Sequence, residues 1–123
     1  MTPEIYRRVC EARPELRVGG SDCYLRYSWV DDVFGAAWYW CACDNVPSSQ
    51  RIVTEDTAHA MILAHWENML PMHHAVFEFS KGQFVVVKLL GDTWEEIGLV
   101  GSSRFHALAE FHVPGSTKGT GDE

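Results

Sequence analysis

The segment FVVVKLL, residues 84 to 90, constrains the fold of this chain more than any other stretch. Successive side chains of a strand point to opposite faces, and here apolar residues fall on both of them. A strand with one face in water would alternate apolar and polar residues, so this strand is predicted to be covered on both sides. Lys-Gly at residues 81–82 and Gly-Asp at residues 91–92 suit tight hairpin turns. Residues 74–100 therefore predict a three-stranded meander.

Two earlier segments predict an aromatic hairpin. CYLRYSWV, residues 23–30, alternates as a strand does, and AAWYWCAC, residues 36–43, follows a turn and is predicted to pair with it. Trp38 and Trp40 share one face of the second strand, and Tyr39 takes the other. Either helices cover both faces, or one aromatic face is exposed for a partner. Aromatic side chains concentrate binding energy at protein interfaces, so this strand gives the sharpest functional indication in the sequence.

The stretch TEDTAHAMILAHWENMLP, residues 54–71, predicts the longest helix. Thr54 suits the N-cap, two acidic residues follow in the first turn, where the helix dipole favours them, and Pro71 ends the helix. The apolar residues recur at helical spacing and form one wide stripe. Its members are Ala58, Met61, Ile62, His65, Trp66, Met69 and Leu70.

A shorter helix is predicted at each end of the chain. The first runs from Pro3 to about Arg13, because Pro14 ends the regular helix. The last covers residues 104–112, with Ser102 or Ser103 as its N-cap. The inner face of the last helix is predicted to carry Phe105, Leu108, Ala109 and His112.

The predicted order is helix, two strands, helix, three strands, helix. The simplest way to bury these apolar stripes is an antiparallel sheet of about five strands with helices packed on its faces. The fold class is therefore α+β, with α-β-α layers. Residues 1–113 are expected to form a single domain. Residues 114–123, PGSTKGTGDE, are expected to be a disordered C-terminal tail, since they include no large apolar residue.

The charge balance limits the kinds of partner. Ten basic and 17 acidic residues give a net charge of −7, which argues against a nucleic-acid backbone as the partner, since phosphate binding needs clustered Lys and Arg. No apolar stretch approaches the roughly 20 residues of a membrane span. The charged N-terminus does not resemble a signal peptide, so we expect a cytoplasmic protein with free thiols.

Metal and catalytic sites have weak support in the sequence. His59 and His65 are six residues apart and cannot share a helix face, so they are no pair of metal ligands. Cys41 and Cys43, with two histidines at residues 73–74, could supply four zinc ligands, but a one-residue gap on a strand does not match structural zinc patterns. Both cysteines are expected to be small buried hydrophobes. We predict no metal and no cofactor.

A cysteine nucleophile would need a base beside it. Cys10 is predicted on the polar side of the first helix and Cys23 in a loop, and either could meet a histidine in three dimensions. The chain contains no nucleophile elbow, phosphate loop or dinucleotide fingerprint. The predicted catalytic set is therefore empty, and an enzyme is the weaker expectation.

Three pieces of the sequence resemble a known family. They are TPEIYRRVCEA near the start, VPSSQRIVTEDTAHAMILAHWENML in the middle, and GSSRFHALAEF near the end. Together they resemble the phage ABA sandwich domain family, small phage proteins of unknown function. The resemblance spans most of residues 3–112 and implies helix–sheet–helix layers. It implies no functional residue, because the family has no established activity.

These observations favour a small acidic phage or prophage accessory protein that acts by binding another protein. Inhibition of a host defence component is one form of that role, and the location would then be the host cytoplasm. The residues expected to bind the partner are Trp38, Trp40, Glu95 and Glu96. One alternative is a small enzyme whose site joins a cysteine to a histidine at residues 73–74. Another is a structural subunit of a larger assembly, which predicts a homo-oligomer.

Overall fold

The computed structural model describes residues 3–20, 23–41, 46–98 and 100–118. They form three α-helices, two short 3-10 helices and six strands, all strand pairs being antiparallel. In chain order the elements are α1 (Pro3–Ala12), η1 (Pro14–Leu16), β1 (Tyr24–Asp31), β2 (Gly35–Cys41), η2 (Ser49–Arg51), β3 (Ile52–Val53), α2 (Glu55–Asn68), β4 (His74–Ser80), β5 (Gln83–Leu90), β6 (Thr93–Glu96) and α3 (Arg104–His112).

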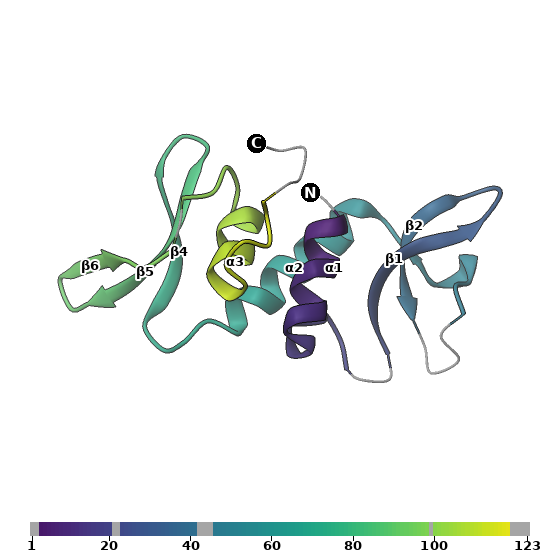
Figure 1. The fold of residues 1–123 in the computed structure, drawn as a ribbon, viewed down its shortest axis with the longest axis horizontal. Helices are drawn as coiled ribbons and strands as arrows, with labels where there is room; N and C mark the ends of the chain where they lie inside the picture. The colour runs from purple at the N-terminus through teal and green to yellow at the C-terminus, as the bar shows by residue number, and fades with distance from the viewer. Residues whose placement is uncertain (1–2, 21–22, 42–45, 99, 119–123) are drawn as a thin grey trace.

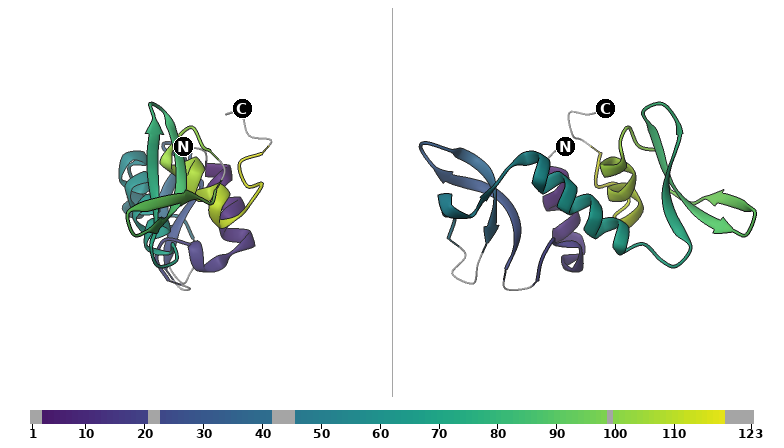
Figure 2. Two further views of the ribbon diagram at one scale, coloured as in Figure 1. Left: turned by 90° about the vertical axis from the view of Figure 1, so that its left-hand side faces the viewer. Right: turned by 180° about the vertical axis from the view of Figure 1, so that it is seen from behind.

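The class is α+β, but the prediction of one sheet with about five strands is wrong. The strands form two separate three-stranded sheets: β1-β2-β3, here called sheet A, and β4-β5-β6, here called sheet B. The three helices lie between them, so the sheets are the outer layers and the helices the middle one (Figure 1). The view from behind in Figure 2 shows the same order.

The second helix explains why the strands do not join into one sheet. α2 begins directly after the two-residue strand β3 and runs for 14 residues. At 1.5 Å per residue it carries the chain about 21 Å away from sheet A before β4 begins. Strands 74–80 and 83–90 therefore start on the far side of the helices, where they pair only with their own neighbours.

The predicted helices form where their sequence signals place them. The hydroxyl of Thr54 accepts the backbone N–H of Thr57 at 3.2 Å, which caps α2. Ser103 is the N-cap of α3, and its hydroxyl accepts the N–H of His106 at 3.1 Å. The predicted inner stripe of α3 is buried, as are Ala58, Ile62 and Trp66 of α2.

The core lies in the middle layer and reaches both sheets. The ring of Trp66 stacks on Phe105 at 5.1 Å between centroids and on Tyr6 at 6.1 Å, and so joins all three helices. Leu25 packs against this cluster from sheet A, and Val86 from sheet B. Burial of large aromatic rings between helices is a strong source of stability for a chain of this size.

The central strand of sheet A, β2, is buried on both faces at Trp38 and Tyr39. Trp38 faces the helices and contacts Tyr6 edge-on, with 5.3 Å between ring centroids. Tyr39 points to the opposite face and is also buried, and η2 lies close to β2. Helices therefore cover one face of the aromatic strand, and the other face is buried with no described α-helix over it, whereas the sequence suggested either helices on both faces or an exposed aromatic face.

Sheet B has only one face covered by another element. Val86 of the central strand β5 packs on the core beside α3, while Val85 and Val87 point the other way. No described helix or strand lies over that outer face (Figure 1). The prediction that residues 84–90 are covered by helices on both sides is wrong. Val85 and Val87 are buried by side chains of their own sheet, and residues 88–90 are exposed.

The last described residues fold back on α3. The carboxylate of Glu110 accepts the N–H of Gly115 at 3.1 Å and that of Thr117 at 2.9 Å. The hydroxyl of Ser116, which is buried, donates to the carbonyl of Ala109 at 3.0 Å. Residues 114–118 therefore form an ordered turn beyond the domain boundary expected at residue 113, and residues 119–123 lie outside the described part of the chain.

Candidate functional site

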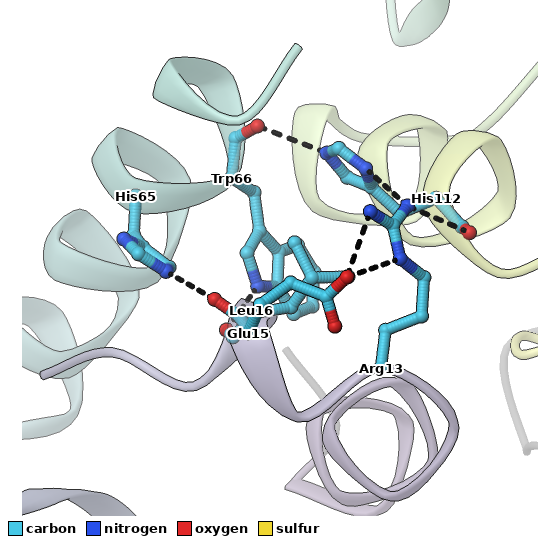
Figure 3. Close-up of polar contacts among 6 residues, drawn as sticks. All are labelled: Arg13, Glu15, Leu16, His65, Trp66 and His112. Carbon is cyan, nitrogen blue, oxygen red and sulfur yellow. Dashed lines mark hydrogen bonds and ion pairs between the residues drawn. The ribbon is translucent and has the colours of Figure 1, made fainter. Parts of the chain in front are cut away.

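A polar junction joins the three helices where η1 passes between them (Figure 3). The indole N–H of Trp66 donates to the carbonyl of Leu16 at 2.9 Å. His65 Nε2 donates to the carbonyl of Glu15 at 3.0 Å, and His112 Nε2 donates to the carbonyl of Trp66 at 2.9 Å. Each of these side chains satisfies a backbone carbonyl at a helix end, so the junction stabilises the packing of the helices.

His112 at this junction is held neutral. Its burial lowers the pKa of the imidazole, and the nearby guanidinium of Arg13 lowers it further, although the bond to the carbonyl of Trp66 acts in the opposite direction. Arg13 also forms an ion pair with Glu15 at 3.1 Å. The histidine therefore donates through Nε2 to a fixed carbonyl, and Nδ1 faces an arginine at 3.5 Å. Neither ring nitrogen faces an open reaction space.

The remaining histidines of α2 and α3 are also structural in geometry. His59 stacks edge-on against Phe105 at 5.9 Å between centroids, and burial lowers its pKa. The hydroxyl of Ser103 lies 2.7 Å from Nδ1 of His106, but the same hydroxyl caps α3. This serine–histidine pair is thus part of a helix cap, and its hydroxyl is not directed at a substrate.

The cysteines do not form a reactive centre in the described residues. Cys10 is buried on the inner side of α1, so the prediction of the polar side is wrong. Burial raises the pKa of its thiol to about 11, which keeps it protonated near neutral pH. Cys23 is exposed and Cys41 is buried, and neither forms a disulfide within the described residues. Cys43 lies outside the described residues, within which no group of three potential metal ligands gathers.

The structure separates the four residues expected to bind a partner. Trp38 is only 3% exposed and Trp40 is half-buried against the core, so both help to attach sheet A to the helices. Glu95 and Glu96 are exposed on β6 of sheet B, at the other end of the molecule (Figure 1). Glu96 lies opposite Val87 on the outer face, and Glu95 lies opposite Lys88 on the other face.

The outer face of sheet B carries an apolar cluster that the sequence analysis missed as a site. Phe77 of β4 and Trp94 of β6 reach toward each other, with their ring centroids 5.1 Å apart, and are 41% and 45% exposed. Leu89, opposite Trp94 in the ladder, is 49% exposed, and Phe79 of β4 is 40% exposed. We call Phe77, Phe79, Leu89 and Trp94 the outer cluster; the rings of Phe77 and Trp94 come from the two strands that flank β5 and meet on the face of Val85 and Val87.

A sequence signal for this cluster exists. Phe-Glu-Phe at residues 77–79 alternates as a half-exposed strand does, but Phe77 lies with Val85 on the face that no described helix covers. The signal could be recognised only once the covered face of the sheet was known. The choice of face depends on where α3 packs, which is a tertiary contact.

Searches among family models, curated proteins and solved structures find no match to this chain. Within the described residues, no helix combines the length and the apolar character that crossing a membrane requires. The fold and the surfaces of the molecule are therefore the basis on which its function is inferred.

Proposed function

We propose that this chain is a small acidic binding protein that docks another protein on the outer face of sheet B. The outer cluster carries the proposal: two half-exposed aromatic rings in contact with each other, on a face that no other described helix or strand covers. Exposed apolar patches of this kind mark interaction sites, and tryptophan and other aromatic residues dominate their binding energy.

The charge around this cluster supports a partner with a basic rim. Residues 74–97 contain four acidic and two basic residues, and Glu96 lies on the same face as Val87. A partner would therefore place an apolar patch on Phe77 and Trp94 and basic side chains near β6. Such complementary charges accelerate association and select the partner.

The resemblance to small phage proteins suggests a setting for this binder. In that setting the chain is a phage or prophage accessory protein, and its partner is a host component such as a part of a defence system. The enzyme alternative joins a cysteine to His73 or His74, but Nδ1 of His74 lies 3.0 Å from the carbonyl of Met72, and Cys10 and Cys41 are both buried.

A pair of tryptophan variants tests the proposal. Trp94→Ser removes the exposed indole of sheet B, and Trp29→Ser removes the 59% exposed indole of sheet A as a matched control. The tagged chain is used to capture proteins from a bacterial lysate, and the affinity of the captured protein is then measured by calorimetry. We expect Trp94→Ser to weaken binding by about 30-fold, equivalent to an interface hot spot of about 2 kcal/mol.

Two results would contradict this proposal. One is a partner that binds Trp94→Ser as tightly as the unmodified chain. The other is a partner lost in Trp29→Ser alone, which would place the binding surface on sheet A. If sedimentation instead shows a dimer that Trp94→Ser dissociates, the face joins two copies of this chain, as the assembly alternative predicts.

A further inference from the structure

A groove lies between α1 and the first strand of sheet A, away from the outer cluster. It encloses about 690 Å³. One wall is formed by α1, including Arg7 and Glu11, and the other by residues 24–28 of β1. The hydroxyl of Tyr6 donates to the carbonyl of Leu25 at 2.7 Å and ties the two walls together at one point.

The strand in this wall is an edge strand. One edge of β1 pairs with β2 over almost its whole length. Among the described residues, the other edge pairs only at its start, where Gly19 bridges Tyr24 and the N–H of Leu25 donates to the carbonyl of Val18 at 2.8 Å. Val18 and Gly19 therefore pair with the start of β1 as a short additional strand would, and the pairing stops after Leu25.

The alternation of an antiparallel ladder determines which backbone groups point outward from that edge. Leu25 directs its N–H away from β2, so the residue two positions later, Tyr27, directs its N–H and carbonyl the same way. Within the described part of the chain these two groups of Tyr27 have no hydrogen-bond partner. They face the groove, and the Tyr27 side chain is 39% exposed. An unpaired strand edge is a template for another strand.

We propose that this groove binds an extended peptide segment of another protein as an additional strand of sheet A. The peptide lies beside β1, next to the short stretch where Val18 and Gly19 pair with it. In this mode of recognition, main-chain hydrogen bonds supply affinity and the groove walls select side chains. This site goes beyond the proposed function and lies on the sheet that does not carry the outer cluster.

The side chains of the groove favour a peptide with an acidic residue. Three arginines line it, Arg7, Arg17 and Arg26, against two glutamates. One of these, Glu4, contacts the guanidinium of Arg8 at 3.1 Å and that of Arg7 at 3.7 Å. The local excess of positive charge stands out in a chain whose net charge is −7, and it complements a carboxylate on the bound strand.

The test starts from a displayed library of short random peptides selected on the full chain. Each selected peptide is resynthesised with a single N-methyl group placed in turn on every residue, and its binding is measured by fluorescence polarisation. An added strand pairs through every second residue. We therefore expect methylation to lower affinity by about tenfold or more at alternate positions only, since each such change removes a hydrogen bond and introduces a clash.

Two variants locate the binding edge. Tyr27→Pro removes the N–H that faces the groove and leaves the pairing with β2 intact, while Tyr27→Val removes the same ring and keeps the N–H. We expect the proline variant to lose binding and the valine variant to retain most of it, with far-UV circular dichroism confirming that both are folded. The methylation pattern is measured on the unmodified chain, and so remains informative if the proline variant does not fold.

Several outcomes would overturn the inference. They are a library that yields no binding peptide, peptides tolerant of methylation at every position, and peptides that bind Tyr27→Pro unchanged. Peptides that lose binding to Trp94→Ser would belong to the outer cluster and count against the groove. A dimer that Tyr27→Pro dissociates would show that the edge pairs with a second copy of this chain and not with a peptide.

Discussion

The hydroxyl of Tyr6 donates to the backbone carbonyl of Leu25 and accepts the backbone N–H of Val18 at 3.2 Å. One buried side chain of α1 thus satisfies two backbone groups of the segment that leads into sheet A. Burial raises the pKa of this phenol well above its ordinary value, so it stays protonated and remains a donor. This bond and the ring contact with Trp38 help to attach sheet A to the helices.

Tyr6→Phe is expected to destabilise the chain by about 1–3 kcal/mol, because it leaves the buried carbonyl of Leu25 and the N–H of Val18 without a partner. The ring contacts remain, so the loss isolates the hydroxyl. Urea unfolding followed by tryptophan fluorescence measures the change. Tyr27→Phe is the control, because its ring is partly exposed, and should change stability by less than about 0.5 kcal/mol. Equal stability of the two variants would show that the hydroxyl of Tyr6 contributes nothing.

Gly101→Ala is expected to destabilise sheet B and α3 together. A Cβ at Gly101 would lie 2.6 Å from the backbone nitrogen of Ala107, while Gly101 is fixed by two hydrogen bonds with Phe84 of 2.8 and 2.9 Å. Overpacking against backbone costs about 1–3 kcal/mol or more. Thermal unfolding should show a clearly lower Tm for this variant. Gly20→Ala, whose Cβ would meet nothing within 4 Å, provides the comparison and should leave the Tm nearly unchanged.

Protonation of His112 is expected to weaken the fold at mildly acidic pH. Its burial depresses the folded-state pKa below the ordinary value of 6.5, so the unfolded chain binds the proton more readily. The stability that the neutral ring provides is present above pH 6.5 and falls as the pH drops through the folded-state pKa. Urea unfolding between about pH 5 and 7.5 should show this loss. His112→Gln keeps a donor for the carbonyl of Trp66 and should flatten the slope; an unchanged slope would assign the pH dependence to other groups.

Glu110 is expected to stabilise the C-terminal turn only while it is ionised. Its partial burial acts to raise the pKa of the carboxyl, but the hydrogen bonds from Thr117 and Gly115 outweigh it and hold the pKa below 4.5. The contribution is therefore present above pH 4.5 and is lost as the pH falls through the lower, folded-state value.

Glu110→Gln replaces one carboxylate oxygen, which accepts a backbone N–H, by an amide NH₂ group, which can only donate. Two donors then face each other. The variant should be less stable than the unmodified chain at pH 7, and the difference should shrink as the pH approaches 3. Unfolding curves at both pH values measure it, with Glu96→Gln on the exposed strand β6 as a control. A difference that stays constant over this range would show that the charge of Glu110 has no part in it.

The sequence predicted the local elements well, because their signals are local. The caps at Thr54 and Ser103, the buried stripe of α2 and the hairpin turn at Gly82 all depend on residues within a few positions of each other. It also placed Trp38 and Trp40 on one face of a strand, as the register shows. The aromatic face was expected to serve a partner, but Trp38 is buried in the core.

By itself, then, the sequence determined which segments are helices and strands and that the class is α+β. The tertiary structure alone decided that the strands divide into two sheets, which face of β5 stays open, and that Phe77 meets Trp94. The physical reason is that periodicity shows that a strand has an apolar face but not which element covers it. That choice depends on the direction in which α2 carries the chain and on the packing of α3 on Val86.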